Sequence, residues 1–86
     1  MDEKRLSELR DKIDAIDVQI ADFLNKRAGM VAEIGDIKRR LNLSIFDEKR
    51  EREIVNKLSI CNAGPLSDET LAAIYHDILR HMKTFE

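Results

Sequence analysis

Apolar residues recur at alternating spacings of three and four through the first half of the chain. This spacing predicts an amphipathic helix whose apolar positions share one seam. Acidic residues near its start and the run Lys38-Arg39-Arg40 near its end suit a helix over about residues 3–41. The seam has eleven positions, which are Leu6, Leu9, Ile13, Ile16, Ile20, Phe23, Arg27, Met30, Ile34, Ile37 and Leu41.

One position of this seam is charged. Arg27 stands where the ten other positions are apolar. Burying an unpaired charge costs several kcal/mol, so an arginine in such a seam needs an anionic partner. Arg27 is therefore the first candidate for contact with a ligand.

Two shorter helices are predicted in the second half of the chain. Asp47 is a suitable N-cap for a helix over about residues 48–61, and Ser67 for one over about residues 68–86. Gly64-Pro65 marks a turn between them. The inward stripe of the second helix comprises Ile54, Val55, Leu58 and Cys61. The apolar face of the third comprises Leu71, Ile74, Tyr75, Ile78, Leu79, Met82 and Phe85.

Composition supports an all-α fold of one long, one short and one medium helix. The 86 residues are 43% hydrophobic and 37% charged, with three glycines and one proline. Gly29 and Gly35 lie inside the long helix, either for close approach of another group or as tolerated surface glycines. That helix would be about 54 Å long, against a diameter of about 30 Å for a compact domain of this size. We therefore expect residues 1–86 to form a single domain that self-associates.

Charge and cysteine content narrow the possible functions. The net charge of -2 gives no indication of nucleic-acid binding, and the single Cys61 fits a reducing compartment. No membrane span or signal peptide is recognisable, so a cytoplasmic location is expected. His76 and His81 are poorly spaced for two metal ligands on one helical face. The apolar face of the last helix runs to the end of the sequence, which suggests one domain of a longer polypeptide.

The basic residues of the long helix could meet only in a dimer. Arg10 and Lys38 each follow a seam residue but are 28 positions apart, roughly 42 Å along a helix. Two antiparallel copies would bring Arg10 of one beside Lys38 of the other, with Arg27 about 16 Å from Lys38. Each pocket would then use Arg27 and Lys38 of one chain and Arg10 of its mate. Alternatively, Arg10 and Lys38 are flanking charges that extend to water, which spacing alone favours for these two.

Several motifs together resemble the all-helical chorismate mutases. They are L-R-D-K-I-D-A-I-D around Arg10, L-N-K-R at Arg27, I-G-D-I-K at Lys38 and F-D-E-K-R-E-R-E from Phe46. The segment G-P-L-S-D-E-T-L-A-A-I-Y-H-D-I-L is similar to the last helix of that domain where it is fused to prephenate dehydratase. The likeness covers nearly the whole chain. It implies an intertwined antiparallel homodimer that converts chorismate to prephenate in phenylalanine and tyrosine biosynthesis.

The resemblance also assigns roles to individual residues. Arg10, donated across the interface, and Arg27 fit the arginines on the substrate carboxylates, and Lys38 fits the lysine that reaches a carboxylate and the ether oxygen. Asp47 and Glu51 fit positions around the substrate hydroxyl, and Arg50 the arginine beside them. The expected catalytic residues are thus Arg27, Lys38 and Glu86, with Arg10, Asp47, Arg50, Glu51 and Met82 in substrate binding.

The pattern departs from the family at the last helix. Met82 stands where some members have serine, and Glu86 where the family has glutamine or glutamate facing the ether oxygen. Glutamine donates a hydrogen bond at any pH, whereas an ionised glutamate only accepts. Glu86 must therefore be protonated to donate, and activity is expected to fall as pH rises.

The implied reaction is an intramolecular pericyclic rearrangement, for which no cofactor, metal or nucleophile is expected. Two alternatives remain open. One is a lyase on the same fold that removes pyruvate from isochorismate. The other is a non-catalytic dimerisation or ligand-sensing domain of a shikimate-pathway enzyme. Observed turnover would separate the enzymes from the sensor.

Overall fold

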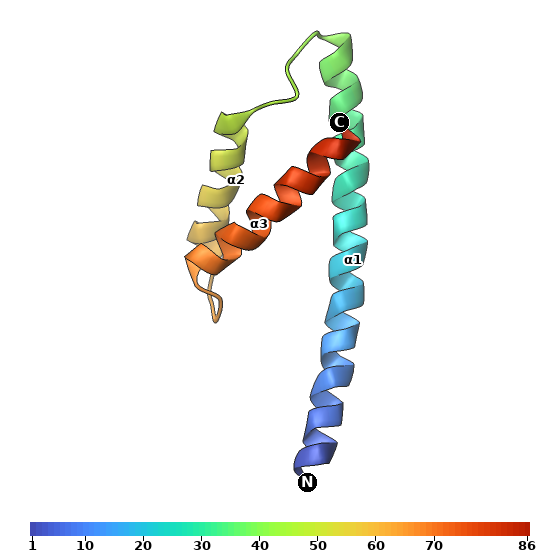
Figure 1. Cartoon of the computed structure of the whole chain (residues 1–86), viewed down its shortest axis with the longest axis vertical. Helices are drawn as coiled ribbons and strands as arrows, with labels where there is room; N and C mark the ends of the chain where they lie inside the picture. The colour runs from blue at the N-terminus through green and yellow to red at the C-terminus, as the bar shows by residue number, and fades with distance from the viewer. The chain divides into compact units, whose positions relative to one another are not determined.

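The computed structural model describes residues 1–86, and all of its regular structure is helical (Figure 1). It consists of α1 (Asp2–Arg40), α2 (Glu48–Cys61), α3 (Asp68–Met82) and the short 3₁₀-helix η1 (Lys83–Phe85). The expected three-helix, all-α class is confirmed. The chain divides into two compact units, Met1–Met30 and Val31–Glu86. None of the helices is long and apolar enough to cross a membrane.

The unit Met1–Met30 contains the first part of α1 and no other helix. Asp2 and Glu3 lie in the first turn, where their charges complement the helix dipole. The apolar seam positions of this unit are 41% to 67% exposed; they are Leu6, Leu9, Ile13, Ile16, Ile20, Phe23 and Met30. The repeat that predicts the helix therefore leaves its apolar stripe uncovered within one chain.

The second unit begins with the end of α1, where backbone hydrogen bonds cap the helix. The N–H of Leu43 donates to the carbonyl of Lys38 at 2.8 Å, and that of Asn42 to Arg39 at 3.3 Å. Asn42 has φ 56°, a left-handed conformation that asparagine tolerates better than most residues. This is the Schellman arrangement, which satisfies carbonyls left over at a helix end. It fixes the place where the chain leaves α1, just after Arg40.

Side-chain caps start the two following helices, as the sequence predicts. Asp47 accepts a hydrogen bond from the backbone N–H of Arg50 at 3.0 Å. Ser67 accepts one from the backbone N–H of Thr70 at 3.1 Å. Each cap satisfies a donor that lacks a partner in the first helical turn.

The connection between α2 and α3 is organised by Asn62. Its side-chain amide donates to the carbonyl of Leu66 at 2.9 Å and to the carboxylate of Asp68 at 2.8 Å. Its amide oxygen accepts from the N–H of Gly64 at 3.1 Å. Gly64 has φ 75°, which only glycine adopts without a steric cost. The turn reverses the chain so that α3 starts beside the end of α2 and packs against it (Figure 1).

The core of the second unit is small. Leu79 and Met82, both on α3, are the two buried apolar side chains of the chain. Three residues that the periodicity places on an apolar face are exposed instead, namely Cys61, Ile74 and Phe85. Cys61 is the last residue of α2, where the chain turns away, and Phe85 follows the point where α3 changes its winding. A helical face continues inward only as far as the partner helix does.

The last turn differs from the α-helix expected to residue 86. The α-helix ends at Met82, and residues Lys83–Phe85 form a tighter 3₁₀ turn. The hydroxyl of Thr84 donates to the carbonyl of His81 at 2.8 Å, and the N–H of Glu86 donates to the carbonyl of Lys83 at 3.2 Å. Such tightening satisfies terminal carbonyls. It rotates Glu86 toward the end of α1, where it lies against Gly35.

Candidate active site

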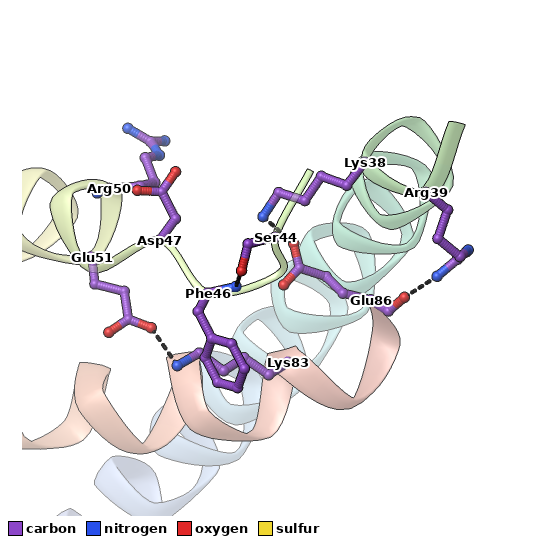
Figure 2. Close-up of polar contacts among 9 residues, drawn as sticks. All are labelled: Lys38, Arg39, Ser44, Phe46, Asp47, Arg50, Glu51, Lys83 and Glu86. Carbon is purple, nitrogen blue, oxygen red and sulfur yellow. Dashed lines mark hydrogen bonds and ion pairs between the residues drawn. The ribbon is translucent and has the colours of Figure 1, made fainter. Parts of the chain in front are cut away.

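Lys38 and Glu86 form the central contact of the candidate site (Figure 2). The Lys38 Nζ donates to the Glu86 Oε1 at 2.9 Å, although the residues are 48 positions apart in sequence. Their side chains are only 16% and 11% exposed, respectively. A charge pair withdrawn from water interacts more strongly than one on the surface and holds a more defined geometry. Two residues assigned to the substrate's ether oxygen are therefore neighbours.

The backbone of Glu86 is also held by α1. Arg39 donates a hydrogen bond to the main-chain oxygen of Glu86, and its guanidinium forms an ion pair with Asp36 as well. Gly35, one turn before Arg39, is buried beneath the backbone of Glu86. The end of the chain thus sits on one face of α1, with its carboxylate beside Lys38.

A second ion pair lies at the junction of α2 and η1, and sequence reasoning missed one of its members. The Lys83 Nζ lies 2.8 Å from the Glu51 Oε1, and the two side chains are 35% and 29% exposed (Figure 2). The same Nζ lies 5.3 Å from the centroid of the Phe46 ring, within cation–π range. The sequence gives no signal for this pairing because α2–α3 packing brings the residues together. Lys83 therefore holds the carboxylate predicted to face the substrate hydroxyl.

Asp47 and Arg50 make local contacts around the start of α2. The Asp47 carboxylate is used as the helix cap, and the Arg50 guanidinium lies 3.6 Å from Glu53 in an exposed ion pair. A pair this exposed adds little stability and leaves the arginine free to exchange partners. The substrate-binding roles of Asp47 and Arg50 stay predictions.

Met82 belongs to the core, with 8% of its surface exposed. A thioether is at best a weak hydrogen-bond acceptor, so it cannot replace a serine hydroxyl as a donor. Met82 is the last residue of α3 and directly precedes η1, which carries Lys83 and leads to Glu86. Substrate contact by Met82 stays a prediction.

Arg10 and Arg27 lie in the other unit, Met1–Met30. Arg10 is exposed and Arg27 is partly exposed. Neither guanidinium takes part in any salt bridge of the chain. Both therefore keep their full capacity to bind carboxylates, and arginine matches carboxylate geometry with two parallel N–H donors.

A separate groove lies between α2 and α3. Its lining residues are Glu48, Glu51, Arg52, Val55, Asn56 and His76. Glu51 is the one predicted site residue that borders it. With two carboxylates and one arginine, the groove lacks the cationic excess that a dicarboxylate substrate requires. The contacts around Lys38 and Glu86 pair two cations, Lys38 and Arg39, with two carboxylates, Glu86 and Asp36, so this cluster is charge-balanced by itself.

Residues 9–86 match the family described as chorismate mutase type II. The chain belongs to this family, and the resemblance inferred from its motifs is confirmed. The family match includes every residue to which the motifs assign a role, from Arg10 to Glu86.

Relatives and solved structures agree with this assignment. A bifunctional chorismate mutase/prephenate dehydratase of Aquifex aeolicus is 41% identical over 80 residues, which cover 88% of this chain and 22% of that protein. The chorismate mutase of Methanocaldococcus jannaschii is 26% identical over 96% of this chain and 85% of its own length. The Form II structure of chorismate mutase from Thermus thermophilus superposes with a TM-score of 0.90 at 33% identity, covering 91% of this chain and 89% of that one. The chain thus spans about a fifth of the bifunctional relative and most of the shorter ones.

Proposed function

We propose that this chain is a chorismate mutase, an isomerase that converts chorismate to prephenate by an intramolecular Claisen rearrangement. The observation that carries the proposal is the ion pair between Lys38 and Glu86, whose side chains are largely shielded from water and 2.9 Å apart. Both residues stand at positions that match the family motif. Arg10 and Arg27 supply further cations without competing intramolecular partners. Three cations, Lys38, Arg10 and Arg27, suit the binding of a small dicarboxylate.

The chemistry requires positioning and charge rather than a nucleophile. Holding the two reacting parts of the substrate in a compact conformer removes much of the entropic barrier. As the ether bond breaks, negative charge develops on its oxygen, and a fixed cation stabilises that charge in the transition state. Lys38 has three N–H donors, so it can bond the ether oxygen and Glu86 at the same time. Arg10 and Arg27 would hold the carboxylates.

We further propose that two chains form an antiparallel homodimer through the α1 seam. The support is the exposure of the seam residues, which continues beyond Met30 through Ile34, Ile37 and Leu41. A contiguous apolar stripe of this length on a surface is typical of an interface. In such a dimer, Arg10 of one chain would complete the site formed by Arg27 and Lys38 of the other.

Incubation of the chain with chorismate is expected to yield prephenate without any added cofactor or metal. The measurement is the loss of chorismate together with chromatographic identification of the product. Release of pyruvate from isochorismate, without prephenate formation from chorismate, would indicate the lyase instead. Binding of prephenate by a folded dimer without turnover would indicate a sensor domain. Either of these two results would contradict the proposal.

Glu86→Gln is expected to retain activity, whereas Glu86→Ala is expected to lower kcat. A glutamine amide can donate to the ether oxygen through its nitrogen and accept from Lys38 through its oxygen, and alanine can do neither. The measurement is the kcat of both variants and of the unchanged chain in one buffer, with Glu69→Gln, an exposed change in the first turn of α3, as control. The control should keep the kcat of the unchanged chain. A kcat of Glu86→Ala equal to that of the unchanged chain would show that the side chain of residue 86 takes no part in the reaction.

A further inference from the structure

The two glycines inside α1 are equivalent in the sequence pattern but not in the structure. A Cβ atom built on Gly29 would meet nothing within 4 Å. A Cβ built on Gly35 would lie 2.8 Å from both the Cα and the main-chain oxygen of Glu86. Carbon atoms do not approach this closely, and the opposing atoms are backbone, which cannot rotate away as a side chain does. Any side chain at position 35 must displace Glu86.

A second contact holds the same backbone. Arg39 lies one turn after Gly35 on α1 and donates to the main-chain oxygen of Glu86. Lys38, between them in sequence, bonds the Glu86 carboxylate at 2.9 Å (Figure 2). One turn of α1 therefore makes three contacts with Glu86. Gly35 allows its backbone to approach closely, Arg39 bonds its main-chain oxygen, and Lys38 pairs with its carboxylate. The backbone contacts involve neither the Lys38 side chain nor the Glu86 carboxylate.

We propose that Gly35 and Arg39 are positioning residues that seat the backbone of Glu86, so that its carboxylate stands beside Lys38 in the reactive geometry. The inference rests on the proposed mutase function for its effect on turnover. Neither residue is required to touch the substrate. Gly35 acts because it has no side chain, so the backbone of Glu86 can occupy the space where a Cβ atom would stand. Arg39 acts by fixing the orientation of the main chain that carries the carboxylate.

Gly35→Ala is expected to lower kcat by about tenfold, because small displacements of catalytic groups have large effects on rate. KM should change much less, since the arginines assigned to the carboxylates are unaltered. The matched control is Gly29→Ala, which makes the same chemical change in the same helix, with the same gain in helix propensity, but in open space. Its kcat should stay within about twofold of the unchanged chain. Equal kcat values for the two variants would overturn the proposal.

A double-variant cycle separates positioning from a general structural effect. In a Glu86→Ala background there is no carboxylate left to misplace, so adding Gly35→Ala should cause little further loss of kcat. If Gly35 instead supports the fold, its substitution should reduce activity by the same factor in both backgrounds. Full additivity would therefore refute the positioning role. Helical circular dichroism, measured on each variant, establishes that equal amounts of folded protein are compared.

Arg39 provides an independent variant that introduces no steric clash. Arg39→Met removes the hydrogen bond to the Glu86 main chain and is expected to lower kcat several-fold. It also removes the ion pair with Asp36, so Asp36→Asn is the control that removes this pair alone. Asp36→Asn should leave kcat unchanged. If both variants lower kcat equally, the backbone contact of Arg39 has no positioning role.

A spectroscopic readout keeps this inference separate from the proposed function. In ¹H–¹⁵N spectra, the amide resonances of Phe85 and Glu86 should shift in Gly35→Ala and remain in place in Gly29→Ala. Failure of the unchanged chain to convert chorismate would refute the mutase function, and the seating of Glu86 would then be judged on these resonances alone. Unshifted resonances in Gly35→Ala would overturn the inference even in an active enzyme.

Discussion

Lys38→Met is expected to lower kcat/KM for chorismate by about 10²- to 10³-fold, the usual effect of removing one donor that stabilises transition-state charge. Lys38 is the cation beside Glu86, and its side chain is 16% exposed. Methionine keeps most of the apolar stem and removes the charge, so the packing of α1 is largely preserved. Both kcat and kcat/KM should fall, because the interaction with the ether oxygen strengthens as the bond breaks. Steady-state kinetics measure both.

Two comparisons make the Lys38 result specific. Lys57→Met changes an exposed lysine on α2 that forms no salt bridge in the chain, and it should leave kcat/KM unaltered. Lys38→Met leaves the Glu86 carboxylate without its partner, which lowers the thermal midpoint. Adding Glu86→Gln removes the uncompensated charge and should restore the midpoint but not the turnover. Recovery of turnover in that double variant would show that Lys38 acts only through stability.

Mixing two inactive variants is expected to restore activity if the site is shared between chains. Arg10→Ala and Arg27→Ala should each abolish measurable turnover, because each removes a charge-assisted contact to a substrate carboxylate. In a heterodimer of the two, one pocket contains both arginines and the other contains neither. Random exchange in an equal mixture makes half of the dimers heterodimers, so about a quarter of the original activity should return. The measurement is the initial rate after subunit exchange.

The control for this experiment is an equal mixture of Arg27→Ala with the double variant Arg10→Ala/Arg27→Ala. No combination of these chains contains Arg27, so activity should not return. Subunit exchange is verified by mass spectrometry of tagged chains under native conditions. Proven exchange without recovery would refute the shared pocket and, with it, the antiparallel arrangement that places Arg10 beside Lys38. Recovery in the control mixture would exclude Arg27 from the site.

Local signals in the sequence are sufficient for the helices and their beginnings. The 3-4 repeat predicts α1, and Asp47 and Ser67 are N-caps in the structure as expected. These features depend on contacts within one helical turn, which neighbouring residues determine. The family motifs are similarly local, since L-R-D-K-I-D-A-I-D and I-G-D-I-K each occupy a few turns of α1. A single sequence therefore identified both the class of fold and the family.

Contacts between distant segments could not be obtained in this way. Nothing in the order of residues pairs Lys83 with Glu51, or distinguishes Gly35 from Gly29. The periodicity also placed Cys61 and Phe85 inward, where the structure has them exposed. Helical spacing states which residues share a face, but the length and position of the neighbouring helix decide how much of that face is covered.

The sequence by itself determined the helices, their caps, the uncovered apolar seam and the set of charged residues typical of a chorismate mutase. The tertiary structure decided which of those charges meet. Lys38 and Glu86 are 48 residues apart, and they touch because η1 tightens after Met82 and Gly35 leaves room for the backbone of Glu86. The physical reason is that periodicity follows from a helix's own geometry. Side-chain contacts between helices depend on how the chain turns between them and on the volume of each residue at the point of approach.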